Sequence, residues 1–307
     1  MELDLVNKIF EDIVRGSPTS LSNYLRTIEF SCPVDQTRTK VYIHSIHLNG
    51  NRQVRTRDFV EFVARHVIEY VIPRSMISEA KKRDEEERMS TNMTRLEFNA
   101  RKLFTPLKNT GEGGEMLLFV LGEVLLRLPQ LLCKMSLKTS AGVHYHGADG
   151  IHVGFSNKEC IELFWGESKF HKSFDSALSS CLESIGPILK RVDGADTEDL
   201  FLLQNHLDLD NIDYTRIVKA LLDKDSAEYN SLKYCGLCLV GFDDDVYSEN
   251  VTEQVLSDLC TGWKQKIKEK LTAEELGSFD IHFFCLPVPD VDEFRRIFLE
   301  TLGVQRA

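Results

Sequence analysis

Residues 142–170, GVHYHGADGIHVGFSNKECIELFWGESKF, decide the fold class of this chain. Turn signals at Gly147 and at Ser156-Asn157 divide the stretch into strand-like segments. These segments are residues 142–146, 150–155 and 160–170. Helical patterns flank them at 115–128, which is apolar on nearly every side, and at 173–189. The order helix, three strands, helix predicts an α/β protein with a mixed sheet.

The remaining segments extend this pattern in both directions. Downstream we expect a strand at 235–242, a helix at 250–271, a strand at 279–288 and a final helix from Val291. Upstream we expect a helix at 2–14, a strand at 39–48, a helix at 56–71, a charged helix at 79–88 and a helix at 96–105. We divide the chain into an accessory N-terminal α+β region, residues 1–90, and a second domain, residues 91–307. The second domain carries an acidic helical insertion at about 192–233.

Composition limits the functions that are possible. The chain has 307 residues, with 48 acidic residues against 37 Lys and Arg, and a formal net charge of -11. Proteins that coat nucleic acid by themselves need clustered positive charge, so the balance argues against that class. A negative chain can still act on nucleic acid when divalent cations link its carboxylates to phosphate. Hydrophobic residues make up 42%, enough for a packed core.

The chain carries no targeting signal that we recognise. No apolar run reaches the roughly 18 residues that a membrane-spanning helix needs, and the first ten residues, MELDLVNKIF, lack a basic signal-peptide start. We therefore expect a cytoplasmic protein with no membrane partner. The eight cysteines are scattered, which favours reduced thiols over a disulfide framework. Cys235 and Cys238 lie three apart in a strand, so they face opposite sides and make a poor metal pair.

Three polar residues of the deciding stretch form a candidate active site. Asp149 stands at the start of one strand, and Glu167 and Lys169 stand in the next. Residues i and i+2 of a strand share a face, so Glu167 and Lys169 should project together. Neighbouring strands lie about 4.8 Å apart, which allows Asp149 and Glu167 to share one cation. Glu115, or Glu112 just ahead of it, would supply a further carboxylate from the apolar helix.

These residue types suit phosphodiester hydrolysis assisted by a metal ion. Mg²⁺ prefers carboxylate oxygens and keeps several waters. A bound ion lowers the pKa of water and neutralises charge on the phosphate, and Lys169 would stabilise negative charge or orient the water. Purely structural interpretations also exist. Glu167 and Lys169 could form a surface ion pair beside a turn aspartate, and Glu115 could stabilise its helix N-terminus.

A second Glu-x-Lys shows that this motif alone is weak. Glu79-Ala80-Lys81 has the same spacing, but it lies in the charge run at residues 79–88 and no Asp precedes it on a strand. Glu167-Ser168-Lys169 follows the apolar strand residues 161–165, and Asp149 lies one hairpin upstream. Context therefore favours Glu167 and Lys169 as the functional pair.

The combination resembles the PD-(D/E)xK nuclease superfamily, whose core runs helix, three strands, helix, strand. Its acid–x–lysine motif corresponds to Glu167 and Lys169, and its single Asp corresponds to Asp149. Its helical Glu corresponds to Glu115 or Glu112. Ala148 stands where the superfamily name has proline, a residue that is often replaced there.

Three segments resemble the HamA family, the effector subunits of the Hachiman anti-phage defence system, more closely. They are GEGGEMLLFVLGEVLL (111–126), GADGIHVGF (147–155) and LFWGESKFHKS (163–173). The resemblance implies an endo- or exodeoxyribonuclease that depends on Mg²⁺ or Mn²⁺ and has little sequence preference. It also implies a HamB-like helicase partner that restrains the nuclease until DNA is perturbed. The partnership rests on the resemblance alone.

Further residues have both functional and structural interpretations. His144 and His146 could bind Zn²⁺ or line the substrate groove, and His152 is similarly open. His171 and Lys172 follow the acid–x–lysine motif and could contact phosphate. The glycine-rich loop at 111–114 precedes a helix but lacks the Lys-Ser/Thr ending of a nucleotide-binding loop.

The acidic segment at 193–213 holds seven acids and no Lys or Arg. It could bind a partner or imitate DNA and cover the groove. The alternative functions for the whole chain are a catalytically inactive interaction subunit with a nuclease-like fold, and a metal-dependent hydrolase that acts on RNA or nucleotides. Intact Asp149, Glu167 and Lys169 argue against the first of these.

Overall fold

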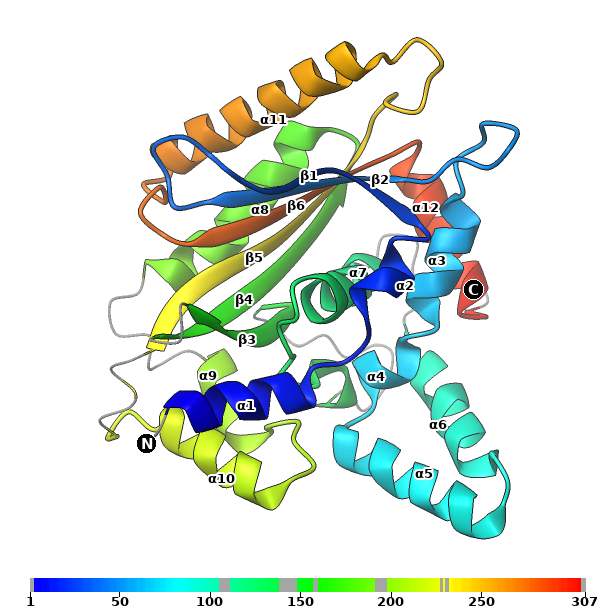
Figure 1. The fold of residues 1–307 in the computed structure, drawn as a ribbon, viewed down its shortest axis with the longest axis vertical. Coiled ribbons are helices and arrows are strands. Elements are labelled where there is room, and N and C mark those ends of the chain that lie inside the picture. Colours follow the sequence, from blue (N-terminus) through cyan, green and yellow to red (C-terminus); the bar gives the residue numbers. More distant parts are fainter. Residues whose placement is uncertain are drawn as a thin grey trace.

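The computed structural model describes residues 3–104, 111–137, 148–156, 160–190, 198–226, 229 and 232–304. In this part of the chain a six-stranded mixed sheet runs through the molecule in the order β1-β2-β6-β5-β4-β3 (Figure 1). The strands are β1 (Leu25–Pro33), β2 (Lys40–Ile46), β3 (Gly150–Ser156), β4 (Cys160–His171), β5 (Leu232–Asp243) and β6 (Ile281–Val288). The outer pairs β1–β2 and β3–β4 are antiparallel, and the inner pairs are parallel.

Helices cover both faces of this sheet. The N-terminal helices are α1 (Leu3–Ile13), α2 (Pro18–Leu21), α3 (Thr56–Ala64), α4 (Val67–Val71), α5 (Arg74–Glu87) and α6 (Thr91–Arg101). The later ones are α7 (Glu112–Val120), the π-helix η1 (Leu121–Leu125), the 3₁₀ helix η2 (Lys134–Leu137), α8 (Phe174–Leu189), α9 (Glu198–Asn205), α10 (Ile212–Leu221), α11 (Glu253–Ala273) and α12 (Val291–Thr301). None of the helices in the described ranges is long and apolar enough to cross a lipid bilayer.

The central strand β5 shows how the two cores are separated. Its residues alternate, so Cys235, Leu237 and Leu239 face the core beneath α3, α7 and α12. Cys238 and Val240 face the other core, beneath α8 and α11. Near-continuous apolar sequence is expected for a strand that is buried on both faces. The interpretation of Cys235 and Cys238 as opposed strand residues is confirmed, and all eight cysteines are free thiols.

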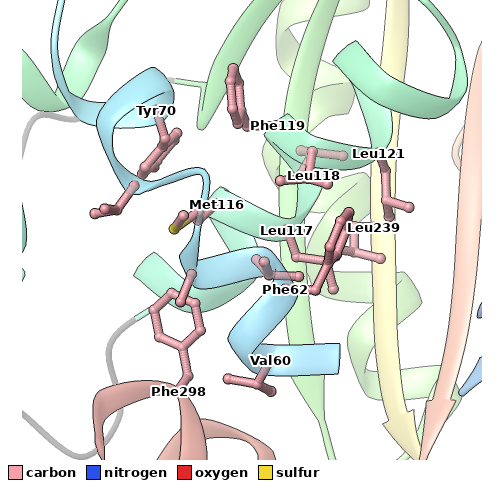
Figure 2. Packing of buried hydrophobic residues seen from close by; sticks show 14 of the residues in the cluster. Val60, Phe62, Tyr70, Met116, Leu117, Leu118, Phe119, Leu121, Leu239 and Phe298 are labelled. Carbon is pink, nitrogen blue, oxygen red and sulfur yellow. The ribbon is translucent and has the colours of Figure 1, made fainter. Parts of the chain in front are cut away.

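The helix α7 lies in the centre of the first core, which explains its unusual sequence. Its residues from Met116 to Val120 are all buried, so the segment has no polar face to expose to water. Figure 2 shows Met116, Leu117, Leu118, Phe119 and Leu121 among Val60, Phe62, Tyr70, Leu239 and Phe298. The helix is expected over 115–128, but it begins at Glu112 and continues as η1 to Leu125. The carboxylates of its first turn are thereby held beside the sheet.

The structure confirms the predicted mixed α/β fold and differs from the sequence-based predictions in several elements. The strand β1 was not expected, and the helix expected at 56–71 is divided into α3 and α4. The strand expected at 142–146 lies outside the described residues. Strands β1 and β2, from the proposed accessory region, belong to the same sheet as the later strands, because β2 pairs with β6. A domain boundary near residue 90 stays a prediction.

Candidate active site

Asp149 and Glu167 are brought together by the antiparallel pairing of β3 with β4. Gly150 pairs with Gly166, which places the preceding Asp149 opposite Glu167. The backbone N–H of Asp149 donates to the carbonyl of Gly166 at 2.8 Å. Its carboxylate Oδ2 accepts a hydrogen bond from the backbone N–H of Ser168 at 2.7 Å. Both bonds fix Asp149 against the strand that carries the acid–x–lysine motif.

Glu167 and Lys169 form an ion pair in which Lys169 Nζ donates to Glu167 Oε1. Glu167 is 6% exposed, whereas Lys169 is partly exposed, so the carboxylate is covered and the ammonium reaches toward solvent. Behind the pair, the thiol of Cys181 in α8 lies 3.8 Å from the Glu167 carbonyl. The strand alternation that places both side chains on one face also places Ser168 on the other.

A third carboxylate approaches from α7. Glu115 lies in the first turn, and its Oε2 accepts a hydrogen bond from the Tyr70 hydroxyl at 3.2 Å. Glu112, at the start of the same helix, is 2% exposed. The charges of both carboxylates raise the pKa of Tyr70, and the charge of Glu115 also raises the pKa of Asp149. Glu115 is therefore electrostatically linked to Asp149.

The carboxylate of Asp149 is buried and is influenced by other negative charges. Burial raises the pKa of Asp149 well above its ordinary value, and the negative charges of Glu115 and Glu167 raise it further. The Lys169 charge and the Ser168 N–H lower the pKa but do not compensate. Deprotonated Asp149 is thus unfavourable without an added positive charge.

The same charges also affect Lys169 and Tyr70. Burial alone would lower the pKa of Lys169, but the carboxylates of Glu167 and Asp149 raise it above its ordinary value, so the side chain stays an ammonium ion. Burial raises the pKa of Tyr70, and the carboxylates of Glu115, Asp149 and Glu112 raise it further. Tyr70 is therefore a neutral hydrogen-bond donor at neutral pH.

The donor set suits a hard divalent cation. Carboxylates of Asp149, Glu167 and Glu115 are the oxygen ligands that Mg²⁺ and Mn²⁺ accept. The pKa of Asp149 is raised by burial first and by the charges of Glu115 and Glu167 second, and a bound cation would oppose both effects. Among the described residues, however, no three His, Cys, Asp or Glu side chains are already grouped so that they could hold a metal ion. The carboxylates share one electrostatic environment, and ligation would require side-chain movement, including release of Glu167 from Lys169.

The remaining candidates lie in different surroundings. His152 is buried, and its Nδ1 donates to the carbonyl of Leu128 at 2.9 Å, so it has a structural role. His171 is half-buried at the end of β4, and Lys172 is exposed and pairs with Asp292 at 3.3 Å. His144 and His146 lie outside the described residues.

Sequence reasoning did not single out several residues of this cluster. Tyr70 belongs to the apolar face of the helix expected at 56–71, and nothing in the pattern distinguishes it from a core residue. The Lys134 ammonium donates to the carbonyl of Ala148 at 2.6 Å and so holds the chain just ahead of Asp149. The backbone amide of Ser168 carries no sequence signal, because every residue except proline has one.

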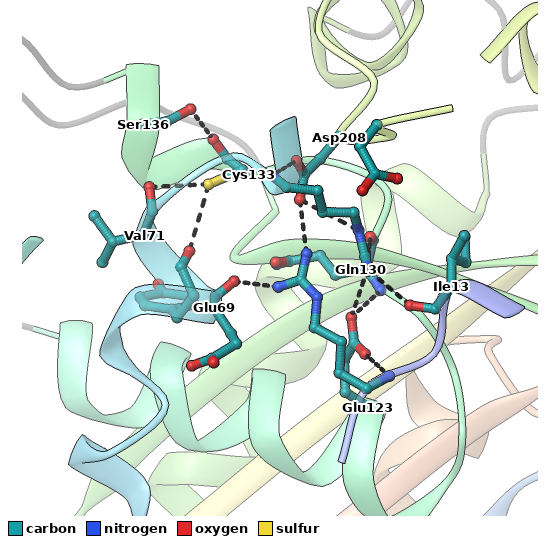
Figure 3. Close-up of polar contacts among 12 residues, drawn as sticks. Ile13, Glu69, Val71, Glu123, Gln130, Cys133, Ser136 and Asp208 are labelled. Atoms are coloured by element: carbon teal, nitrogen blue, oxygen red, sulfur yellow. Dashed lines mark hydrogen bonds and ion pairs between the residues drawn. The ribbon is translucent and has the colours of Figure 1, made fainter. Parts of the chain in front are cut away.

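A buried ion network holds the segment that continues α7 (Figure 3). The carboxylate of Glu123 in η1 accepts hydrogen bonds from the backbone N–H groups of Arg15 and Gln130, both at 2.8 Å, and from Arg74 Nη2 at 3.2 Å. Asp208, from the acidic insertion, accepts from the backbone N–H of Arg74 at 2.6 Å and from Arg15 Nη2 at 3.0 Å. At least this acid of the insertion has a structural partner.

The crowding at Asp149 predicts that the residue destabilises the metal-free protein. An acid whose pKa is raised by folding costs stability as the pH rises from its unfolded to its folded pKa. The free energy of unfolding of Asp149→Asn, measured with urea at pH 7 in the presence of chelator, should therefore exceed that of the wild type by on the order of 1 kcal/mol. The difference should shrink as the pH is lowered toward 4, where Asp149 is protonated. An Asp149→Asn protein that is less stable at pH 7 would show that the carboxylate is stabilised in this site.

Comparison with known proteins identifies the family. The model of the HamA family matches residues 22–302, which include all elements of the sheet and the whole acidic cluster. No match was found among curated proteins. Because the match covers nearly the whole chain, the protein belongs to the HamA family, which places it in the context of Hachiman anti-phage defence.

Proposed function

We propose that this chain is a metal-dependent DNA nuclease that hydrolyses phosphodiester bonds with little sequence preference. The observation that carries the proposal is that buried Asp149 lies within the electrostatic reach of Glu115, Glu167 and the Lys169 ammonium. Asp149 directly precedes β3, Glu167 and Lys169 lie in β4, and Glu115 lies in α7. Glu167 and Asp149 in turn act on the Lys169 ammonium. A buried carboxylate such as Asp149, whose pKa is raised by burial and by neighbouring acids, is a functional-site candidate on physical grounds.

Each residue has a distinct role in this proposal. Asp149, Glu167 and Glu115, or Glu112 in its place, hold Mg²⁺ or Mn²⁺. When bound, the ion neutralises charge on the phosphate and lowers the pKa of a coordinated water. Lys169 remains charged next to the pair of acids, so its ammonium stabilises negative charge on the phosphate or orients the water. Tyr70 fixes the orientation of Glu115 through its hydroxyl.

We further propose that the PD-(D/E)xK core is formed by α7, β3, β4, α8 and β5. Support comes from the chain order of these elements, with β3 and β4 antiparallel and β4 and β5 parallel. Of the three strands expected between the two helices, β3 and β4 are described, and the first, at 142–146, lies outside the described residues. Residues 91–307 then form the nuclease domain, and the N-terminal region enlarges its sheet with β1 and β2. The partner that we propose is a HamB-like helicase, and this part of the proposal rests on the resemblance to the HamA family.

Plasmid cleavage tests the proposal. The purified chain incubated with supercoiled DNA should produce nicked or linear DNA in Mg²⁺ or Mn²⁺, and chelation with EDTA should reduce the rate at least about a hundredfold, because the carboxylates alone repel phosphate. The assay is run with and without the proposed helicase partner, because the resemblance implies that this partner restrains the nuclease. Parallel RNA substrates distinguish a ribonuclease. Absence of cleavage in every arm would favour an inactive interaction subunit.

A further inference from the structure

The helical hairpin of α5 and α6 carries an exposed groove in which apolar and positively charged side chains are combined. Figure 1 shows the two helices projecting from the body of the molecule next to α4. The groove has a volume of about 750 Å³, and its lining residues, which include Arg88, Arg95 and Phe98, all come from the turn between the helices and from α6. Met89 is 63% exposed and Phe98 is 60% exposed. Apolar side chains that are exposed together and surrounded by polar groups mark an interaction surface.

One face of α6 points to solvent and carries no acidic residue. Its members are all exposed and follow the helical spacing i, i+3, i+4, i+7 and i+11, and they are Thr91, Thr94, Arg95, Phe98 and Lys102. The opposite face holds the buried Leu96 and Ala100, which attach the helix to the core. A helix face that is merely solvated usually mixes both charge signs, whereas this face is positive only.

The positive charges of this surface have no acidic partner in the described part of the chain. None of the ion pairs there involves Arg88, Arg95 or Lys102. The one acid of α6, Glu97, is paired with Arg101 at 2.8 Å. Three cations without acidic partners are thus gathered at one place on a chain whose formal net charge is -11. Such cations beside an exposed aromatic ring attract a polyanion that also presents aromatic groups.

Phe98 and Lys102 form the centre of the surface. The Lys102 Nζ lies 4.0 Å from the centroid of the Phe98 ring, which is a cation–π contact. The contact restricts the ring and holds a positive charge beside it. Because most of the Phe98 side chain stays exposed, ring surface remains available to another aromatic group. Every nucleic-acid base can stack on such a ring, and the phosphate next to the stacked base is then close to the ammonium.

The hairpin turn has an arginine where glycine would fit better. Arg88 ends α5 with φ 55° and ψ 41°, in the left-handed region, which glycine adopts at lower cost. The bonds that close the helix come from the backbone N–H groups of Arg88 and Met89, which donate to the carbonyls of Glu85 and Asp84. The exposed guanidinium takes no part in these bonds, so the turn does not depend on it and the charge is available to a ligand.

The C-terminal end of α6 connects this surface to the acidic cluster. Phe98 lies within about two helical turns of Phe104, and the ring of Phe104 packs against that of Tyr70 with the centroids 6.3 Å apart. The Tyr70 hydroxyl in turn donates to Glu115. The acids of the cluster outnumber the Lys169 ammonium and repel phosphate, so a nucleic-acid substrate needs affinity from a positive surface outside the cluster.

We propose that the outward face of α6 and the hairpin turn form a binding surface for single-stranded DNA, separate from the acidic cluster. A base stacks on Phe98, and Arg88, Arg95 and Lys102 bind the phosphates on either side of it. A single strand fits better than a duplex, because the bases of a duplex are already stacked on one another. The assignment to DNA rests on the proposed nuclease function.

The affinity of a fluorescent single-stranded oligodeoxynucleotide, measured by anisotropy in EDTA at low salt, tests the stacking contact. Phe98→Ala should weaken binding about tenfold, a loss within the range for one stacked base, and Phe98→Trp should restore it. Phe201→Ala is the matched control, because Phe201 is 65% exposed but lies in the acidic insertion. A duplex of the same sequence should lose less than about threefold with Phe98→Ala. An equal loss on both forms of DNA overturns the preference for a single strand.

The salt dependence of the same binding tests the phosphate contacts. Arg95→Gln and Lys102→Gln should each reduce the slope of log affinity against log salt by about 0.7, the value for one lost contact with single-stranded DNA. Arg83→Gln removes the same charge from α5, where Arg83 pairs with Glu79, and should leave the slope unchanged. Circular dichroism confirms that each variant is folded.

The outcomes separate this surface from the nuclease proposal. Wild-type protein that does not bind the oligonucleotide, or Phe98→Ala, Arg95→Gln and Lys102→Gln proteins that all bind it as the wild type does, overturns the surface, whatever the plasmid assay shows. Binding that is weakened as expected, in a chain that cleaves no DNA in any arm of that assay, refutes the nuclease and leaves the surface standing. Variants that keep DNA binding but no longer co-elute with the helicase in size-exclusion chromatography would assign the groove to a protein and overturn its assignment to DNA.

Discussion

Glu167→Gln and Lys169→Met should each reduce DNA cleavage in Mg²⁺ by about a thousandfold, a loss within the range for groups that act on the charge of a transition state. Glu167→Gln keeps the shape of the side chain and removes the charge that a cation needs. Lys169→Met keeps the aliphatic stem and removes the ammonium that is paired with Glu167. Rates are measured on plasmid DNA, and circular dichroism confirms that each variant is folded.

The chain contains its own control for this experiment. Glu79 and Lys81 have the same spacing but lie on α5, where Glu79 pairs with the exposed Arg83. Glu79→Gln and Lys81→Met should cleave DNA at the wild-type rate, because neither group contacts the acidic cluster. Equal cleavage by the wild type and the Glu167 and Lys169 variants would attribute the activity to a contaminant or to another site.

Arg74→Ala should lower the free energy of unfolding by about 3–5 kcal/mol, the loss typical of removing one partner of a buried ion pair. Arg74 is 9% exposed, and its removal leaves Glu123, which is 1% exposed, without its guanidinium partner. It also removes the donor to the carbonyl of Ile13. For a protein of marginal stability this is a large fraction of the total. Urea unfolding at pH 7 measures the change.

A matched variant and a double variant test the cause of this loss. Arg83→Ala removes an exposed arginine that pairs with Glu79, and should change stability by less than about 0.5 kcal/mol. Adding Glu123→Gln to Arg74→Ala should recover part of the loss, because a buried amide costs less than a buried unpaired carboxylate. A loss below about 1 kcal/mol in Arg74→Ala would show that water or a rearranged side chain replaces the guanidinium.

The local elements of this fold follow from the sequence because each has its own periodicity. The alternation in residues 160–170 predicts β4, and the same alternation places Glu167 and Lys169 on one face. The turn signal in the sequence at Ser156-Asn157 predicts that residues 150–155 and 160–170 form a hairpin. This prediction places Asp149 near Glu167. These inferences need only contacts that are close in the sequence.

Long-range pairings could not be derived in this way. Strand β2 pairs with β6, and neither sequence pattern indicates which strand the other one pairs with. Glu123 in the π-helix η1 is bonded to Arg15 and Arg74, which come from distant segments, and to the nearer Gln130. The proximity of Tyr70 to Glu115 depends on how α4 packs against α7. The acidic insertion was assigned from charge alone, and its anchoring through Asp208 required the structure.

Anomalous diffraction from crystals soaked in Mn²⁺ tests the central claim most directly, because it locates the ion and its ligands together. We predict one peak within about 2.0–2.6 Å of carboxylate oxygens of Asp149 and Glu167, with Glu115 or Glu112 as the third acidic ligand and Lys169 displaced from Glu167. A peak bound elsewhere, or no peak at an Mn²⁺ concentration that supports cleavage, would contradict the assignment of these carboxylates as the metal site.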